Sequence, residues 1–435
     1  MTAMEKVFRK AYSLFQNQGL LNKINNYSHL YYDEPAFFNY ISDISLNTQQ
    51  LDKPEKYYSY LTNTLASGTS FESSSQALTK CLSETAERIC LYLYPIKKIY
   101  FGSSLKLGQS ALDLGLYANG PEFIRKRLGW TKGINLFDQS LVSIPAQLVY
   151  LQYYHYLMYI KNGQERILAP VNSNGAASGK SKTESILRGL YETIERDAAM
   201  TFFLIKAQAP KIDISLINNP KIQRILDNYQ RYHLDWQLFE ITNDIGVPSF
   251  LSLLIDRSGI GPALSAGVKT NLSALQAILG SAEEALAARI SARNTLIKNN
   301  SLATNDDDFI IDNWQMRSKY WSRLDNLSQL DFLLNQKPQK LKPDRITIRN
   351  INLNQQLKSL TKIMQKQFQA VFAVDITLPF CKQIGLSVNK VIAPELQPFY
   401  LNEAHRDLNQ TRLNQVSDFY HQPKLVINSS PHFYI

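Results

Sequence analysis

The chain has 435 residues, of which 44% are hydrophobic and 19% charged, so it holds enough apolar material for one large core or two ordinary ones. Its formal net charge is +10, but no run of Lys and Arg with interleaved aromatic residues indicates a nucleic-acid binder, and an anionic ligand or acidic partner accounts for the excess more simply. The three cysteines, Cys81, Cys90 and Cys381, follow neither zinc nor disulfide spacing, which predicts a reducing, cytoplasmic location.

No segment predicts export or a membrane span. Glu5 and Arg9 interrupt any apolar core that a signal peptide would need. The most apolar long stretch, residues 144–160, contains Gln147 and His155 and is expected to be a buried element with polar side chains.

Hydrophobic periodicity divides the rest of the chain. Residues 1–66 carry helical patches but no motif, and we expect an N-terminal extension ahead of a catalytic domain at 67–435. Within that domain apolar spacing predicts, in chain order, a helix at 76–94, a strand at 166–171, a helix at 182–203, a strand at 247–255, a helix at 272–297, and short strands at 371–376 and 388–392. Residues 298–344 have the composition of an insertion, and 421–435 form an extended tail. Long helices alternating with strands predict a mixed α+β fold.

One charged pattern occurs twice. The sequence Glu84-Thr85-Ala86-Glu87-Arg88 returns as Glu192-Thr193-Ile194-Glu195-Arg196, and spacings of three and four place the charged members of each copy on one helix face. Glu184 shares the second face, and a third helix offers Glu284 and Arg289. A single copy would indicate a solvated, ion-paired face. Repetition within apolar sequence indicates instead that both faces point inward.

Carboxylates that converge in a protein interior repel one another and lose hydration, so they require cations. Magnesium is the favoured cation because it prefers hard oxygen ligands and commonly bridges a few carboxylates to substrate phosphates. The arginines of the pattern would then contact the phosphates directly.

A competing nucleotide site is suggested by the sequence from Gly175 to Ser181, which ends in Gly-Lys-Ser. A Walker A loop has four residues between its glycines, whereas three lie between Gly175 and Gly179, and Asn174 stands at the first glycine position. A true P-loop is therefore disfavoured. The backbone amides of the turn and the start of the following helix are still suited to holding a phosphate.

These residues resemble a known family. The stretch from Ser173 to Gly179, followed by Glu184 and by residues 192–197, is similar to the central signature of the YcaO family. The similarity spans about residues 66–435, and further blocks agree in order at 77–90, 145–151, 246–248, 284–289 and 394–398.

The resemblance implies a YcaO-type fold whose ATP site is built from carboxylate- and arginine-bearing helices. The carboxylates that match magnesium ligands are Glu84, Glu87, Glu192, Glu195 and Glu284. The positions that match nucleotide and phosphate contacts are Arg88, Glu184, Arg196 and Arg289. Three residues depart from the family pattern: Cys81 for a serine, Lys180 for an asparagine, and Ala287 for a glutamine. Lys180 adds a charge that either binds a phosphate or lies in a solvated loop.

Blocks at 145–151 and 391–398 resemble the azoline-forming branch of the family. The resemblance implies an ATP- and Mg²⁺-dependent cyclodehydratase that converts Cys, Ser or Thr of a precursor peptide into thiazoline or oxazoline rings. Expected partners are the precursor, an E1-like or leader-binding protein and a flavin-dependent dehydrogenase, without nucleic acid or membrane, and a homodimer is left open. A thioamide-forming YcaO enzyme and a non-catalytic nucleotide-binding accessory protein remain alternatives.

The C-terminus departs most from that branch. It keeps the pair Pro431-His432 but lacks a full alternating-proline tail. The terminal carboxylate of Ile435 is the candidate catalytic group, because an ionised carboxylate can accept a proton or orient the attacking side chain. His432 is expected to be a solvated terminal residue rather than a base.

Overall fold

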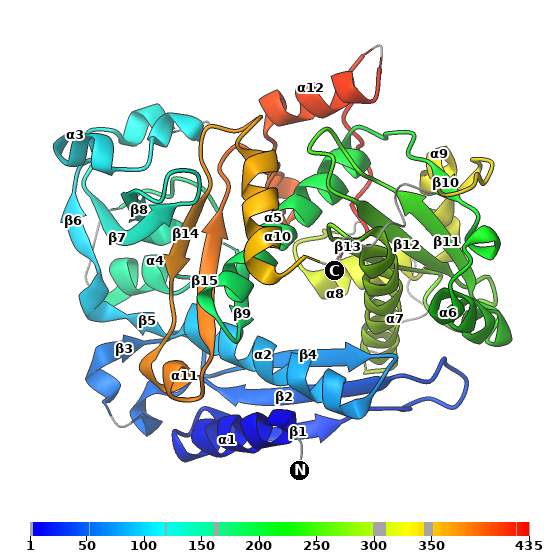
Figure 1. The fold of residues 1–435 in the computed structure, drawn as a ribbon, viewed down its shortest axis with the longest axis horizontal. Coiled ribbons are helices and arrows are strands. Elements are labelled where there is room, and N and C mark those ends of the chain that lie inside the picture. The colour runs from blue at the N-terminus through cyan, green and yellow to red at the C-terminus, as the bar shows by residue number, and fades with distance from the viewer. Residues whose placement is uncertain are drawn as a thin grey trace. The chain divides into compact units, whose positions relative to one another are not determined.

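The computed structural model describes residues 3–51, 53–117, 120–160, 165–170, 172–298, 310–342, 351–422 and 424–434. The chain divides into two compact units (Figure 1). Unit 1 comprises residues 1–30, 36–193 and 351–395, and unit 2 comprises 31–35, 194–350 and 396–435. The boundary falls inside the helix α5 (Lys182–Leu204), which therefore contributes residues to both units.

Unit 1 contains two antiparallel sheets, one with the strand order β1-β2-β4 and one with the order β6-β7-β14-β15-β9, in which β8 also pairs with β7; β3 and β5 form a short ribbon. The strands are β1 (Leu21–Asn26), β2 (Phe38–Ser45), β3 (Tyr57–Tyr58), β4 (Asn63–Ser70), β5 (Tyr94–Pro95), β6 (Tyr100–Gly102), β7 (Leu128–Asn135), β8 (Leu141–Pro145), β9 (Ala176–Gly179), β14 (Phe372–Asp375) and β15 (Ser387–Ile392). The helices are α1 (Ala3–Asn17), α2 (Ser74–Tyr92), α3 (Ser104–Leu107), α4 (Tyr153–His155), α10 (Leu353–Met364) and α11 (Pro379–Gln383). Helix α2 packs on β2 and β4 and also contacts β9 of the larger sheet (Figure 1).

Unit 2 is built on a four-stranded antiparallel sheet with the order β10-β11-β12-β13. The strands are β10 (Lys211–Ile212), β11 (Asp235–Glu240), β12 (Ser249–Ile255) and β13 (Leu264–Thr270). The helices are α6 (Pro220–Arg231), α7 (Ala274–Lys298), α8 (Trp314–Trp321), α9 (Asp331–Leu334) and α12 (Gln410–Phe419). Helix α7 packs along β12 and β13, and α6 lies beside β11 (Figure 1).

The expected α+β class is confirmed, and so are most expected elements. The helices expected at 76–94, 182–203 and 272–297 are α2, α5 and α7, and the later strands are β12, β14 and β15. The strand expected at 166–171 is wrong for residues 166–170, which form no strand, and residue 171 lies outside the described residues. Its backbone bonds to a side chain instead: Leu168 N donates to Gln147 Oε1 at 2.7 Å, and Gln147 Nε2 donates to Arg166 O at 3.3 Å.

The expected domain boundaries stay predictions. Residues of the proposed N-terminal extension form α1, β1 and β2, and β4 runs across the expected boundary at residue 66. The described part of the proposed insertion, residues 310–342, contains α8 and α9. In the described chain no helix has the length and apolar character needed to cross a membrane.

Helices α2 and α7, which carry the charged residues of interest, each cross a strand at a glycine. A Cβ at Gly68 of β4 would lie 2.1 Å from both the Ala77 oxygen and the Cys81 nitrogen. A Cβ at Gly267 of β13 would lie 2.2 Å from the Ser281 oxygen and 2.3 Å from a nitrogen of α7. Because any side chain there would push the helix away, these glycines set how closely α2 and α7 approach their sheets.

A buried ion-pair network holds α5 within unit 2. The Arg412 guanidinium donates to Asp197 Oδ2 at 2.8 Å and to Asp244 Oδ2 at 2.8 Å, and the Gln397 backbone N–H donates to Asp197 Oδ1 at 2.8 Å. Arg412 and Asp197 are both fully buried. Asp197 directly follows Glu195 and Arg196 on α5, so this network fixes the turn of helix that carries them.

The C-terminal tail is packed inside unit 2. His432 is fully buried, its Nε2 donates to the Tyr400 carbonyl at 2.8 Å, and its Nδ1 accepts from the Tyr434 backbone N–H at 3.3 Å. The His432 carbonyl accepts from Arg317 at 2.7 Å and from the Trp321 indole at 3.1 Å. Burial, followed by the Arg317 charge, lowers the pKa of His432 well below its usual range. The expectation of a solvated His432 is therefore wrong.

Changing Gly68 to Ala should destabilise the protein by about 1–3 kcal/mol, because the added methyl group overpacks the β4 and α2 contact. Gly102→Ala is the matched control, since a Cβ there meets no atom within 4 Å. Chemical unfolding of both variants measures the difference. Equal stability of the two variants would show that α2 can move off β4 without cost.

His432 should make stability depend on pH. Because its pKa is lowered in the folded state, the unfolded chain alone takes up this proton as the pH falls through about 6.5, so the free energy of unfolding should fall by up to about 1.4 kcal/mol per pH unit below that value. His432→Gln should remove this component of the slope between pH 6 and pH 5. The exposed His405→Gln is the control and should leave the slope unchanged. An identical slope in the His432 variant would contradict the buried, neutral imidazole.

Candidate metal and nucleotide site

The first copy of the charged pattern lies on α2 in unit 1. Arg88 Nη2 pairs with Glu84 Oε1 at 3.0 Å, and Glu84 Oε2 accepts from the Ser67 backbone N–H of β4 at 3.2 Å. Both side chains are about 30% exposed, at 28% for Arg88 and 30% for Glu84. Glu87, on the next turn, is partly buried. The face of α2 that carries Glu84, Glu87 and Arg88 is therefore partly buried, neither fully exposed to solvent nor part of the hydrophobic core.

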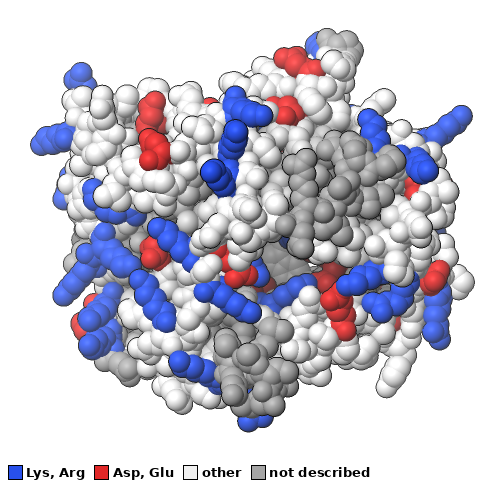
Figure 2. Space-filling view, viewed as in Figure 1, with Lys and Arg blue, Asp and Glu red and all other residues white. Residues whose placement is uncertain are grey.

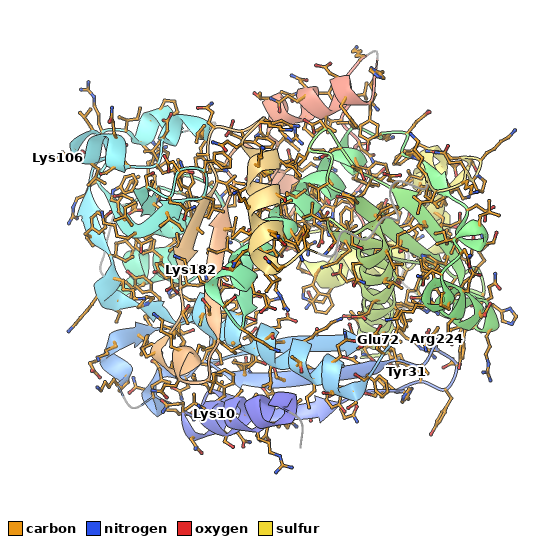
Figure 3. The ribbon with its side chains drawn as sticks, viewed as in Figure 1. Lys10, Tyr31, Glu72, Lys106, Lys182 and Arg224 are labelled. Carbon is orange, nitrogen blue, oxygen red and sulfur yellow. The ribbon has the colours of Figure 1, made fainter. Side chains whose placement is uncertain are left out.

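The segment that resembled a P-loop is a strand. Residues Ala176–Gly179 form β9 and pair with β15, so the residues between the two glycines cannot wrap a phosphate as a loop. Chain direction reverses at Lys180 and Ser181, directly before α5, and Figure 3 labels Lys182 at this transition. The backbone N–H of Lys180 donates to Glu184 Oε2 at 2.9 Å, while the Lys180 side chain is exposed.

Glu184 and Glu192 lie on the first part of α5. Glu184 Oε1 pairs with Arg188 Nη2 at 2.6 Å. Glu192 Oε2 accepts from the Gly175 backbone N–H at 3.0 Å, just before β9. Each carboxylate thus has one oxygen held by a backbone amide, which fixes the direction in which the carboxylate points.

A lysine that the sequence analysis did not single out lies among the unit 1 carboxylates. Lys390 of β15 is buried, and its Nζ donates to the Asn172 carbonyl at 2.6 Å. Burial lowers the pKa of Lys390 to about 8, against the opposing influence of the Glu192 and Glu87 carboxylates. Burial raises the pKa of Glu87 well above its usual range, and the charges of Glu192 and Glu84 raise it further. These carboxylates are therefore close enough to repel one another.

Unit 2 has a corresponding arrangement around Lys269 of β13. Lys269 Nζ lies 2.7 Å from Glu284 Oε1 of α7 and 3.5 Å from Glu195 Oε2 of α5. Glu195 Oε2 also accepts from the Thr270 backbone N–H at 3.0 Å. Burial raises the pKa of Glu195 to about 7; the Lys269 charge opposes this shift and the Glu284 charge adds to it. The sequence signal for both lysines was a single charged residue within a strand, β15 for Lys390 and β13 for Lys269.

The two arginines predicted in unit 2 differ in their contacts. The Arg196 guanidinium lies 5.0 Å from the centre of the Phe399 ring, a cation–π distance. Arg289 is 4% exposed and donates to Glu34 Oε2 at 2.7 Å, to Asp256 Oδ2 at 2.8 Å and to the Pro262 carbonyl at 3.0 Å. Each of its three nitrogens thus already donates to a protein acceptor.

The segment that binds Arg289 comes from residues 31–35. Arg293, one turn further along α7, pairs with Glu34 Oε1 and Asp33 Oδ2 at 2.7 Å each, and its guanidinium lies 4.2 Å from the centre of the Tyr31 ring. Figure 3 labels Tyr31 near the end of α7. These contacts fasten the short segment to α7.

The donor set suits magnesium bound together with phosphate. Among the described residues, no three His, Cys, Asp or Glu side chains gather closely enough to hold a metal ion by themselves. Mg²⁺ usually takes only one or two carboxylates and completes its shell with waters and substrate phosphates. Burial is the main cause of the raised pKa at both Glu87 and Glu195, and the charges of neighbouring carboxylates add to it, so each group holds carboxylate charge that is poorly solvated. Added cations would therefore stabilise both groups.

The structure thus brings together Glu84, Glu87, Arg88 and Glu192 in unit 1, and Glu195 and Glu284 in unit 2. Their roles, and those of Lys180, Glu184, Arg196 and Arg289, stay predictions. Ile435, the candidate catalytic terminus, lies outside the described residues.

Solved structures with the same fold provide a comparison. A structure described as a heterocyclase in complex with substrate and cofactor superposes with a TM-score of 0.75 at 20% identity, covering 100% of this chain and 58% of that one. YcaO from Methanopyrus kandleri, bound with AMPPCP and Mg²⁺, gives 0.66 at 15% identity over 94% of this chain and 95% of that one. The E. coli microcin synthetase McbBCD complex gives 0.58 at 17% identity over 94% and 96%. The chain therefore spans little more than half of the heterocyclase and nearly all of the other two chains.

A family model described as YcaO cyclodehydratase, ATP- and Mg²⁺-binding, matches residues 71–397. This range contains both copies of the charged pattern and the third helix with Glu284 and Arg289. The expected cofactors, ATP and Mg²⁺, are those of the family. The match covers most of the sequence, and the chain belongs to the YcaO family.

Proposed function

We propose that this protein is an ATP- and Mg²⁺-dependent cyclodehydratase that converts Cys, Ser or Thr residues of a precursor peptide into thiazoline or oxazoline rings. The observation that supports it best is the pair of carboxylate groups, each facing one strand lysine, in a member of a family described by ATP and Mg²⁺ binding. Backbone amide oxygens are poor leaving groups, so ring closure needs activation. ATP would supply the phosphoryl group that makes the oxygen leave, with Mg²⁺ neutralising its charge.

We assign the metal to Glu84, Glu87, Glu192, Glu195 and Glu284. Each of Glu84, Glu192 and Glu195 has one oxygen on a backbone N–H, which orients the carboxylate toward a cation. The second oxygen of Glu84 pairs with Arg88, which would have to share it with the metal. The strand lysines would hold the carboxylates in place before the cations arrive. Preorganised carboxylates of this kind avoid reorganisation during the reaction.

We assign phosphate and nucleotide contacts to Arg88, Lys180, Glu184 and Arg196. Arg88 and Arg196 present guanidinium groups next to the carboxylates, and such groups match phosphate geometry. Arg289 belongs to the same set by family position, but its contacts with Glu34, Asp256 and Pro262 oppose a direct phosphate contact and favour a role in holding α7.

The proposals of a peptide substrate and of partner proteins are supported by the descriptions of the similar structures. The heterocyclase of the first comparison is described with substrate and cofactor, and the microcin synthetase is described as a complex. We propose that this protein likewise acts with an E1-like or leader-binding protein, and with a flavin-dependent dehydrogenase that oxidises the rings. Mass spectrometry of a precursor incubated with ATP and partner tests the reaction: each ring removes one water, whereas thioamide formation would exchange oxygen for sulfur.

The metal assignment predicts loss of ATP turnover. Glu84→Gln, Glu192→Gln and Glu195→Gln should each lower Mg²⁺-dependent phosphate release by about 100-fold or more, the size of effect seen when one transition-state contact is removed. The fold should persist, because each change removes a charge from a mutually repelling group. Glu122→Gln is the control, since Glu122 lies 3.6 Å from Arg166 in a well-exposed ion pair. Near-normal turnover in two of the three variants would exclude this metal site.

We also propose that the terminal carboxylate of Ile435 is catalytic, and this proposal predicts a loss of ring formation without a loss of ATP binding. Deleting residues 431–435 would remove buried Phe433 and Tyr434, so it cannot separate folding from catalysis. Appending one alanine after Ile435 moves the carboxylate by about 3.5 Å and keeps every residue. We expect ring formation to fall at least about 10-fold with ATP affinity unchanged. Ile435→Val, which keeps the carboxylate in place, is the control. Unchanged conversion in the extended protein would exclude a catalytic carboxylate.

A further inference from the structure

Unit 1 contains a pocket of about 570 Å³ that none of the proposed metal or nucleotide residues line. It is lined by Lys56, by Tyr57 of β3 and Pro95 of β5, and by four residues at and before α11: Thr377, Leu378, Pro379 and Lys382. Lys97 and Lys98 follow β5 directly and line the same pocket. Figure 2 shows Lys and Arg side chains gathered on the part of this face where β5 and α11 lie in Figure 1.

Of the four lysines that line the pocket, Lys382 alone has an acidic partner among the described residues. Lys56, Lys97, Lys98 and Lys382 line it, and no acidic residue does. Lys382 lies 3.7 Å from Asp375 in an ion pair whose side chains are well exposed, and such a pair is weak. In the described chain no ion pair engages Lys56, Lys97 or Lys98. Four cationic groups around one hollow repel one another, so an anionic ligand is favoured there.

Apart from Thr377 and the Tyr57 hydroxyl, the remaining lining is apolar. Pro95 and Leu378 are buried, and the half-buried Tyr57 adds a ring. The methylene stems of the lysines extend this apolar surface. No arginine lines the pocket, so it lacks the rigid fork of donors that matches phosphate best. The ligand should therefore combine carboxylates with an apolar side chain.

The volume of the pocket suits a short peptide segment as the ligand. It falls within the range of about 300–1,000 Å³ typical of ligand pockets. A folded partner would need roughly 800 Å² of contact surface on each side, which a pocket of this size does not provide alone. A few residues of flexible peptide fit this space and can present an apolar side chain between carboxylates.

We propose that this pocket binds an acidic segment of the peptide substrate, with an apolar side chain inside the pocket and carboxylates on Lys56, Lys97, Lys98 and Lys382. The identity of the ligand as the substrate rests on the proposed function. Binding at this pocket would raise the local concentration of the residues to be cyclised without taking part in the chemistry.

The test uses a fluorescein-labelled synthetic peptide of alternating Leu and Glu pairs, titrated with the full chain in the absence of ATP. The double variant Lys97→Gln/Lys98→Gln should weaken binding about five- to ten-fold, as expected for two partly exposed charge contacts. The control Lys358→Gln/Lys366→Gln changes the charge equally at two exposed residues that do not line the pocket, and should bind like wild type. A probe with Ser in place of Leu should also bind more weakly to the wild-type protein.

If both double variants weakened peptide binding equally, or if the Leu and Ser probes bound with equal affinity, the proposed binding site would be wrong. Only diffuse attraction of the peptide to a basic surface would then remain. An oligonucleotide of equal charge that binds as tightly, with the same dependence on Lys97 and Lys98, would overturn it as well. Phosphate release from ATP by Lys97→Gln/Lys98→Gln should match wild type.

The results also separate this proposal from the proposed function. If peptide binding behaves as expected but no peptide is cyclised, the proposed function is wrong and the binding site stands. If cyclisation occurs and the lysine substitutions have no effect on it or on binding, the binding site is wrong and the proposed function stands.

Discussion

Repulsion between carboxylates is the constraint on which the rest of the structure depends. In unit 1 Glu84 and Glu192 act on Glu87 through their charges, and the cations among them are Arg88 and buried Lys390. In unit 2 Glu195 and Glu284 share Lys269. Burying like charges costs free energy unless cations compensate. A protein gains nothing in stability from such groups, so their repetition in two units argues for a ligand that brings positive charge.

The fold holds these groups in place by close backbone packing. Gly68 and Gly267 let α2 and α7 lie directly on their strands, and the backbone amides of Ser67, Gly175 and Thr270 each hold one carboxylate oxygen. Backbone donors on sheets move little, so the carboxylates are oriented before any ligand binds. The buried ion pair of Arg412 with Asp197 likewise fixes α5 immediately after Glu195 and Arg196.

The sequence alone predicted the parts that depend on local pattern. Helices α2, α5 and α7 follow from apolar periodicity and the charged repeat follows from spacing. The strand expected at 166–171 is absent over residues 166–170, where the side chain of Gln147, nineteen residues from Arg166, bonds the backbone at Arg166 and Leu168. The pairing of Arg289 with Glu34 joins residues 255 positions apart, which no local pattern encodes.

Two further features of the structure could not be predicted from the sequence: the roles of the two strand lysines and the burial of His432. Lys390 lies in the strand expected at 388–392, and Lys269 lies in β13, where no strand was expected. A lone lysine in a strand carries meaning only once the strand is known to face carboxylates. His432 seemed solvated because it lies near a chain end, yet Arg317, Trp321 and Tyr400 enclose it. Position in the sequence is a poor guide to burial when a tail packs into the core.

The central claim is that the two carboxylate groups bind magnesium together with ATP. Calorimetric titration of the intact protein with ATP, once with Mg²⁺ and once with a chelator, tests it most directly. The account predicts measurable binding only with Mg²⁺, because phosphates alone would meet carboxylates of the same sign. Equally tight binding of ATP in the chelator would contradict it, since the arginines and lysines would then hold the nucleotide without a metal.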